Sequence, residues 1–368
     1  MTAWTLEPLV PEFVRQFEAY VPSRPDPELM ALYGVPRLFR LNNNENPLGP
    51  PAAAQEVLRR FPPPRAAVYP SGDSFYLRRR LGAALGVDPE QVLVGNGANE
   101  AIGFVIKAFC QEGDNIVTAD RTFAVYEWTA RFSGIDARLV PLSDLGFDDE
   151  GMLARIDART KVLFVCNPNN PTGTFWDRER LRRFVERVDG RAVVVVDEAY
   201  AEFVEDASYP DGLALLPDHP NVVVFRTFSK MWGLAGLRVG YLVGERKVVD
   251  TVRRTCTVYS VNGLAQEAAL AALGDDGHVP ATRLLVREEK AYLASELSAM
   301  GLTVNAREGP YVMVELPVSD TLAYRRLMAE GVMVRTMTGF RFPGWIRVSI
   351  GRHDAMEAFV GALRRALA

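Results

Sequence analysis

The chain has 368 residues, of which 48% are hydrophobic and 24% are charged, and its formal net charge is −4. This composition is typical of a globular protein with a large core and excludes a disordered or fibrous chain. The small negative charge argues against nucleic acid as a partner, because a polyanion-binding protein normally carries a basic patch. No apolar stretch reaches membrane-spanning length, and no basic segment followed by an apolar run opens the chain. We therefore expect an untargeted cytoplasmic protein that contacts no membrane.

Neither the cysteines nor the histidines form a recognisable site. Cys110, Cys166 and Cys256 are far apart and lie in apolar stretches, which favours buried, reduced thiols. Three histidines have no ligand-like spacing: His219, His278 and His353. We expect them at the surface, and we expect no metal site. The absence of a Gly-x-Ser-x-Gly sequence also argues against a serine hydrolase.

Three regions of different character follow one another along the chain. The first forty residues are rich in Pro and Glu, and the prolines of Val21–Pro25 exclude a helix interior there. We expect an extended arm that packs against the last region. From there to about residue 255, short apolar runs alternate with amphipathic stretches, which predicts βα units and a mostly parallel sheet. In the last hundred residues, a helix over 282–300 precedes strands over 311–316 and 345–350.

This organisation predicts an α/β fold with two domains, since the chain is longer than a single core usually supports. The arm and part of the small domain would occupy residues 1–40. A large domain would occupy residues 41–265, and a smaller α+β domain residues 266–368.

Three apolar runs in the large domain are continuous and rich in Val, as expected of parallel strands that are covered on both faces. They are Val162–Cys166, Ala192–Val196 and Val222–Phe225. Each ends in a polar cluster, respectively Asn167–Gly173, Asp197–Tyr200 and Arg226–Lys230. Because ligands of open α/β sheets bind beyond the carboxyl ends of the strands, we expect these clusters to meet at one site.

Lys230 directly follows the third of these strands and a serine. It could be an ordinary exposed lysine. At the mouth of an apolar cleft, however, a lysine loses solvation and its pKa falls. The free amine can then form a Schiff base with an aldehyde cofactor.

Asp197 ends the strand Val193–Val196, where an unpaired charge is costly. A cationic partner is therefore expected. The protonated pyridine nitrogen of pyridoxal 5′-phosphate (PLP) is such a partner, and its protonation makes PLP an electron sink. An N-cap or a core salt bridge is the alternative explanation.

A glycine-containing turn, Gly95–Glu100, follows the apolar run Gln91–Val94 and precedes the helix-like stretch Ala101–Lys107. The free amides of such a helix N-terminus can bind phosphate. A Rossmann dinucleotide site is disfavoured, because Glu100 stands where its third glycine is required. A plain turn remains the alternative.

Seven motifs follow one another over nearly the whole chain: Asn44–Pro47, Tyr69–Pro70, Gly95–Glu100, Pro168–Gly173, Asp197–Tyr200, Ser229–Lys230 and Gly236–Gly240. Each is weak by itself. In this order and at these spacings, the chain resembles a fold-type I PLP-dependent aminotransferase of the histidinol-phosphate aminotransferase family. The resemblance implies PLP as cofactor, a large domain whose mostly parallel sheet lies between helices, and a smaller α+β domain.

The resemblance also implies roles for individual residues. Lys230 would hold PLP as a Schiff base and carry the proton, and Asp197 would pair with the pyridine nitrogen. Asn170 and Tyr200 would hydrogen-bond the ring hydroxyl. The phosphate would be bound by the backbone amides of Ala98 and Asn99 and by the side chains of Ser229 and Arg238. Tyr69 would reach the phosphate from a neighbouring subunit, which implies a homodimer with shared active sites.

Further positions correspond to cofactor-ring and substrate contacts of the family. Phe123 occupies the place of a tyrosine that stacks on the cofactor ring. Arg347 matches the arginine that binds the substrate α-carboxylate, although a surface strand arginine is the alternative. Tyr20 and Arg335 fall where the family contacts the distal group of the substrate, and Asn46 is also assigned to the substrate.

Three positions depart from the pattern of the family and leave the substrate open. Arg121 replaces a common proline, Pro310 replaces a substrate-facing asparagine, and Phe123 lacks a phenolic oxygen. The first hypothesis is amino transfer between glutamate/2-oxoglutarate and histidinol phosphate/imidazole acetol phosphate, as in histidine biosynthesis. An aromatic amino-acid aminotransferase, or a PLP-dependent decarboxylase or oxidase, is the alternative. A DNA-binding regulator is disfavoured because the arm is too short and proline-rich for a helix-turn-helix.

Overall fold

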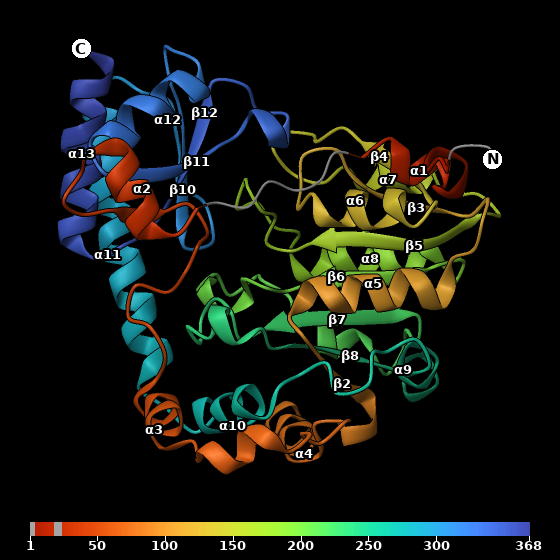
Figure 1. The fold of residues 1–368 in the computed structure, drawn as a ribbon. Coiled ribbons are helices and arrows are strands. Elements are labelled where there is room, and N and C mark those ends of the chain that lie inside the picture. Colours follow the sequence, from red (N-terminus) through yellow and green to blue (C-terminus); the bar gives the residue numbers. More distant parts are fainter. Residues whose placement is uncertain (1–3, 18–23) are drawn as a thin grey trace.

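Two β-sheets organise the protein, which a computed structural model describes over residues 4–17 and 24–368 (Figure 1). The larger sheet has the strand order β2-β8-β7-β6-β5-β3-β4, and only β8 runs antiparallel to its neighbours. Its strands are β2 (Val92–Gly95), β3 (Asn115–Ala119), β4 (Asp136–Val140), β5 (Thr160–Cys166), β6 (Val193–Asp197), β7 (Val222–Thr227) and β8 (Gly240–Gly244). The mostly parallel sheet predicted from the apolar runs is thereby confirmed.

Helices cover both faces of this sheet. They are α5 (Ala98–Phe109), α6 (Val125–Phe132), α7 (Asp149–Ala154), α8 (Arg178–Val188) and α9 (Arg246–Arg253). Figure 1 shows α5 in front of the strands and α8 behind them. Every residue of β6 is buried, as a continuous run of valines in a doubly covered strand requires.

A helical layer lies beyond the β2 edge of the large sheet (Figure 1). It consists of α3 (Ala52–Arg60), α4 (Phe75–Leu85) and α10 (Gly263–Ala272). The buried alanines of α10 belong to the same hydrophobic cluster as the large sheet. The predicted domain boundary at 265/266 therefore falls inside a helix, and the packing moves it beyond residue 272.

The smaller sheet has the order β1-β11-β12-β10-β9, in which β1 and β11 are parallel and the other pairs antiparallel. Its strands are β1 (Phe39–Leu41), β9 (Val304–Asn305), β10 (Tyr311–Glu315), β11 (Val332–Thr336) and β12 (Trp345–Ser349). The helices α11 (His278–Ala299), α12 (Asp320–Ala329) and α13 (His353–Leu367) pack on it and share a second hydrophobic cluster. This is the α+β arrangement expected of the last region.

The N-terminal segment is helical in two places, so the expectation of an extended arm is wrong there. Helix α1 spans Glu12–Arg15 and α2 spans Asp26–Tyr33. Pro25 is the N-cap of α2, a position where the missing amide proton costs nothing. Leu29 of α2 packs against Met328 and Met333, which confirms the expected contact with the last region.

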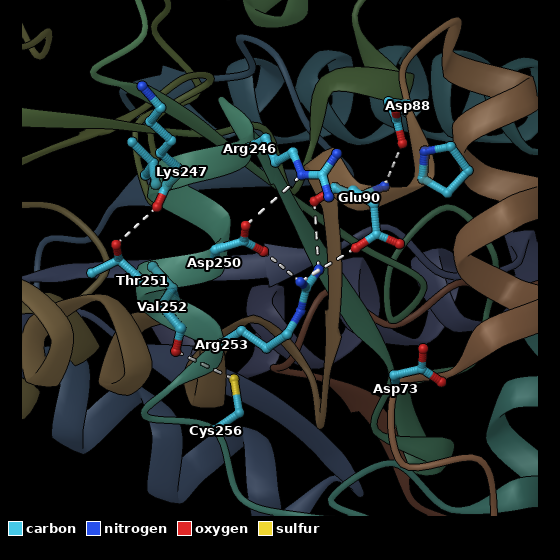
Figure 2. A network of polar contacts seen from close by, with 12 residues as sticks. Asp73, Asp88, Glu90, Arg246, Lys247, Asp250, Thr251, Val252, Arg253 and Cys256 are labelled. Atoms are coloured by element: carbon cyan, nitrogen blue, oxygen red, sulfur yellow. Dashed lines mark hydrogen bonds and ion pairs between the residues drawn. The ribbon is translucent and has the colours of Figure 1, made fainter.

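Charged side chains join α9 to the short turn Pro89–Gln91, which precedes β2 (Figure 2). Arg253 contacts both Asp250, at 2.5 Å, and Glu90, at 3.4 Å. Cys256 follows and donates to the Val252 carbonyl at 3.6 Å. Cys256 is only partly buried, as is Cys110, so the expectation of buried thiols holds fully for Cys166 alone.

Candidate active site

The polar clusters at the carboxyl ends of β5, β6 and β7 meet at one cavity of about 410 Å³, as the strand pattern predicted. Segments of the smaller sheet close its other side. Most of the predicted site residues line it: Ala98, Asn99, Phe123, Asn170, Asp197, Tyr200, Ser229, Lys230, Arg238, Arg335 and Arg347. Among the described residues that line the cavity, the charged side chains are those of Lys230, three arginines, Asp197 and Glu45, so cations outnumber acids there.

Lys230 lies directly beyond β7, and its Nζ donates to the Asn43 carbonyl at 2.7 Å. Burial lowers the pKa of Lys230 to about 8, and the positive charges of nearby arginines, first that of Arg347, add to the effect. A substantial fraction of this amine is therefore unprotonated near neutral pH. Such an amine can attack an aldehyde, whereas a solvated lysine is almost fully protonated.

Asp197 ends β6 and is 3% exposed. It accepts hydrogen bonds from the Tyr126 hydroxyl at 2.5 Å and from the Ala199 amide at 3.0 Å. Within residues 4–17 and 24–368 it forms no ion pair, which rules out the core salt bridge considered as the alternative. Burial raises the pKa of this carboxyl group, since charge in a low-dielectric site is disfavoured. A cation in the cavity would reverse that effect.

Tyr200 and Asn170 lie side by side above the carboxyl ends of β6 and β5. The Asn170 amide is 3.5 Å from the Tyr200 hydroxyl, to which Asn44 also donates at 2.9 Å. Burial raises the pKa of Tyr200 to about 12, so its hydroxyl remains a hydrogen-bond donor at neutral pH. Donors placed in this way can stabilise an oxyanion.

The N-terminus of α5 forms an anion cradle at one end of the cavity. No side chain caps this twelve-residue helix, whose first residues, Ala98 and Asn99, line the cavity. The Arg238 guanidinium packs on Gly97 and donates to the Ser229 hydroxyl at 3.3 Å. A Cβ at position 97 would lie 2.3 Å from Arg238 Nη2, so only glycine allows this approach. Free amides, a hydroxyl and a guanidinium are the donors that a phosphate requires.

Two arginines from the smaller sheet enter the cavity at the opposite end. Arg335 of β11 and Arg347 of β12 are directly paired across the strands. Arg347 is 3% exposed and donates to the Asn42 carbonyl at 3.0 Å and to the side chain of Asn170. The buried Nε of each arginine lacks a hydrogen-bond partner, and neither forms an ion pair with a described residue. Paired like charges with unused donors indicate an anionic ligand.

Among the described residues, two predicted site residues do not line the cavity of their own chain, namely Asn46 and Tyr69. The Asn46 amide donates instead to the Met231 carbonyl at 2.7 Å and to Thr282 at 3.2 Å, because the turn at Pro47 directs it toward α11. In the single chain, the Asn46 amide is therefore engaged by the protein and does not face the cavity. Tyr69 is 80% exposed and stacks on Tyr259. Tyr20 lies outside the described residues.

Sequence reasoning missed several residues that shape the site. Tyr126 donates to Asp197 from the first turn of α6, and no motif marks it; its ring makes an edge contact with that of Phe123, which precedes the helix. Phe340 lines the cavity but follows a strand of the smaller sheet, where no motif marks it. His278, expected at the surface, is buried and lies 3.0 Å from the Met231 carbonyl through Nε2.

Two further expectations concern metals and membranes. Among the described residues, no three His, Cys, Asp or Glu side chains are grouped so that they could hold a metal ion. In the same part of the chain, no helix combines the length and the apolar character that crossing a bilayer requires.

Residues 36–363 match the family model of aminotransferases of class I and II, so the chain belongs to that family. It is a PLP-dependent aminotransferase with the fold-type I architecture. It is 38% identical over 366 residues to a histidinol-phosphate aminotransferase of Anaeromyxobacter sp., covering 98% of this chain and 99% of that protein. It is 40% identical over 357 residues to histidinol-phosphate aminotransferase 2 of Pseudomonas aeruginosa, covering 96% of each chain.

Among solved structures, a histidinol-phosphate aminotransferase from Sinorhizobium meliloti in complex with pyridoxal-5′-phosphate has the same fold. Its TM-score is 0.88 and its sequence identity is 24%, with 100% of this chain and 98% of that chain covered. The cavity fits this cofactor. It presents an amine of lowered pKa, a buried carboxylate without a cationic partner, and an uncapped helix N-terminus beside a guanidinium.

Proposed function

We propose that this aminotransferase moves an amino group between glutamate/2-oxoglutarate and histidinol phosphate/imidazole acetol phosphate. The observation that carries the proposal is the pair Arg335 and Arg347, which face one another across β11 and β12 with buried, unpartnered Nε atoms. The two guanidinium groups can bind the anionic groups of either donor, the phosphate of histidinol phosphate or the carboxylates of glutamate, while the α5 end binds the phosphate of PLP. The proposal therefore assigns the arginines to substrate and the α5 cradle to cofactor.

In this proposal, the residues of the α5 end hold PLP. The amides of Ala98 and Asn99, the Ser229 hydroxyl and the Arg238 guanidinium bind its phosphate. Asp197 pairs with the pyridine nitrogen, which is the cation that its buried carboxylate lacks. When bound, PLP supplies an electron-withdrawing ring that stabilises negative charge at the substrate α-carbon.

The remaining residues orient groups and move protons. Asn170 and Tyr200 donate hydrogen bonds to the ring hydroxyl, and Phe123 packs on the ring face. Lys230 Nζ would hold the cofactor aldehyde, and as a free amine it would take the proton from the substrate α-carbon. The pKa of about 8 suits this role, because a base is most effective when its pKa lies near the working pH.

For the substrates, we assign the carboxylate of glutamate and the phosphate of histidinol phosphate to different arginines. Arg347 is buried beside Asn170, so a substrate carboxylate such as that of glutamate binds there in bidentate fashion. Arg335 is less buried and bonds Asn43 at 2.8 Å, so it would receive the distal anion. An aromatic amino acid is the second candidate, because Phe123, Tyr200 and Phe340 give the cavity three aromatic walls.

A titration followed by visible absorbance would test the proposal. Purified holoenzyme is mixed in separate cuvettes with glutamate, histidinol phosphate and phenylalanine, and the loss of the PLP band is recorded against donor concentration. Adding 2-oxoglutarate should restore the band. Half-conversion at the lowest concentration by histidinol phosphate supports the proposal, whereas the same result with phenylalanine selects the aromatic candidate. If no donor converts the band, amino transfer is refuted.

We also propose that the enzyme is a cytoplasmic homodimer in which Tyr69 completes the active site of the partner. Tyr69 and Tyr259 are stacked at 4.7 Å on an exposed surface, outside the cavity of their own chain. Mixing the inactive variants Tyr69→Ala and Lys230→Ala provides a test. Hybrid dimers would contain one intact site and regain up to about a quarter of the activity, since random assembly makes about half the dimers hybrid. A mixture without any recovery would refute shared sites.

A further inference from the structure

The loop that follows β11 in the smaller sheet reaches across to the large sheet beside the cavity. It contains the short turn Thr338–Phe340 and Arg341, whose φ of 61° is left-handed. Its base is firmly held by Asp320, a residue of α12 that is 2% exposed. This carboxylate accepts hydrogen bonds from the amides of Met337 and Thr338, at 2.9 and 2.8 Å. The start of the loop is therefore fixed to the smaller sheet.

The far end of the loop is fixed to the large sheet. Arg341 donates to both carboxylate oxygens of Glu127, at 3.0 and 2.9 Å, and to the Asp120 carbonyl. Glu127 lies on α6 and its side chain is only 10% exposed. Both contacts to the carboxylate come from Nη2, and an ion pair with a largely buried carboxylate is screened less by solvent than a surface ion pair. The pair therefore joins the two sheets at a defined position.

Arg121 adds a second contact to the same junction. Its guanidinium lies 5.0 Å from the centre of the Phe342 ring, and it also pairs with Asp120 at 3.3 Å. Phe342 is buried with Met313 and Met337 in a separate small cluster. The arginine that stands in place of the common proline thus has a structural role, because it extends the contact between the loop and the large sheet.

Between these two fixed ends, Phe340 turns into the cavity. It lines the cavity together with Phe123, and its ring centre is 5.9 Å from the guanidinium carbon of Arg347. A substrate whose carboxylate binds Arg347 would therefore contact Phe340. A smaller hollow of about 70 Å³ lies behind the ring, between the loop and α6. Without the Glu127–Arg341 pair, the ring would have room to withdraw.

We propose that Phe340 is a specificity-determining residue that covers a substrate bound at the Arg335 and Arg347 end of the cavity, and that the Glu127–Arg341 ion pair positions it. This inference rests on the proposed function, and it identifies the substrate as one with a flat unsaturated ring. Such a ring gains contact with Phe340 that a short or flexible donor does not. Phe340 touches substrate, whereas Glu127, Arg341 and Arg121 act only by positioning it.

The experiment is to measure steady-state amino transfer with holoenzyme, separately for histidinol phosphate, phenylalanine and glutamate as donors. The variants are F340A, F340L, E127Q, R341M and the double variant E127Q/R341M. The matched control is E330Q, which breaks the exposed Arg365–Glu330 pair of the smaller sheet, away from the cavity. Thermal unfolding of each variant reports whether it is folded. If E127Q does not fold, R341M still tests the Glu127–Arg341 pair.

We expect F340A to lower kcat/KM for the two ring-bearing donors by about tenfold or more, with little change for glutamate, and F340L to lie between. E127Q and R341M should raise KM for the ring-bearing donors by about three- to tenfold, with kcat nearly unchanged. The double variant should lose clearly less than the sum of the two single losses, because both single variants break the Glu127–Arg341 pair. E330Q should behave as the unmodified enzyme.

Equal losses for all three donors in F340A, or additive losses in the double variant, would overturn the inference. So would unchanged kinetics in folded F340A. Failure of the proposed function gives a different result, because the unmodified enzyme would then transfer an amino group from none of the three donors. If phenylalanine proves the preferred donor, the role of Phe340 stands and only the distal phosphate is lost from the proposal.

Discussion

The Tyr126 hydroxyl donates a 2.5 Å hydrogen bond to Asp197 Oδ2, and both side chains are buried. The Tyr126 ring stacks on Phe164 with 4.7 Å between centres, so its hydroxyl has one fixed position. One oxygen of the carboxylate is thereby occupied by a neutral donor and the other by the Ala199 amide. Together these donors orient the carboxylate without neutralising it, which leaves its charge available for a cationic ring nitrogen.

Replacing Tyr126 with Phe should weaken PLP binding. A hydrogen bond to a charged group contributes roughly 1.5–3 kcal/mol, so we expect about a 10- to 100-fold rise in the Kd for PLP. The Kd is measured by titrating apoenzyme and following absorbance. Tyr209→Phe is the control, since its hydroxyl bonds the Asn167 carbonyl and does not line the cavity. An unchanged Kd in Y126F would show that the contact is merely structural.

Replacing Lys230 with Ala should abolish amino transfer. The variant loses both the group that holds the cofactor aldehyde and the proton carrier, so we expect kcat to fall by about 10⁴-fold or more. Lys290→Ala is a demanding control, because burial also lowers the pKa of Lys290 to about 8. Its Nζ bonds the Arg307 carbonyl outside the cavity, so K290A should stay active. Activity retained in K230A would refute the assignment.

The capture of PLP by apoenzyme should depend on pH with a midpoint near 8, the pKa to which burial and nearby arginines lower that of Lys230. The rate of PLP capture rises with pH through this value, because only the unprotonated amine attacks the aldehyde. An exposed lysine would instead give a midpoint of about 10.4. Arg347→Met removes the positive charge that lowers this pKa most and should move the midpoint upward. Stopped-flow absorbance over pH 6–11, roughly the range that brackets both values, measures it. A midpoint that stays near 10 contradicts the prediction.

Arg335 and Arg347 should have separable effects on the two substrates. For R335M we expect the KM for histidinol phosphate to rise about 10- to 100-fold, while the KM for glutamate changes little, since a charge-assisted contact to phosphate is lost. For R347K we expect kcat/KM for glutamate to fall, because lysine cannot make a bidentate contact with the carboxylate. Steady-state kinetics with each substrate measures both. Identical profiles for the two variants would argue against separate binding sites.

A methyl group at position 97 should damage the phosphate cradle specifically. Gly97 has a φ of 77°, and an added Cβ would lie 2.3 Å from Arg238 Nη2. Gly86 has a φ of 70° with nothing within 4 Å of an added Cβ, so G86A carries only the left-handed backbone cost of about 1–2 kcal/mol. We expect both variants to lose thermal stability but only G97A to lose PLP affinity. Equal PLP affinities would refute the close approach of Arg238 to the turn.

Several features could be predicted from the sequence because they depend on local pattern. Continuous valine runs identified β5, β6 and β7, and the polar residues after each run identified the edge where Asp197 and Lys230 meet. The order and spacing of the motifs identified the family and its cofactor. These inferences needed no long-range contact, since parallel strands with buried faces must align their carboxyl ends.

Other features were decided only by tertiary packing. The helices of the N-terminal segment, the position of α10 and the burial of His278 depend on which surfaces other elements cover. Asn46 belongs to a site motif, yet its amide turns away from the cavity toward Met231.

The sequence alone therefore determined which residues lie at the ends of the strands, because strand pattern and motif order are properties of short segments. Only the tertiary structure decided what those residues face. Tyr126 reaches Asp197 across 71 positions of the chain, and Arg341 reaches Glu127 across 214. Contacts over such separations leave no periodic signal in the sequence, since each depends on how two independently formed elements pack. Their geometry sets the environment of the carboxylate and the position of Phe340.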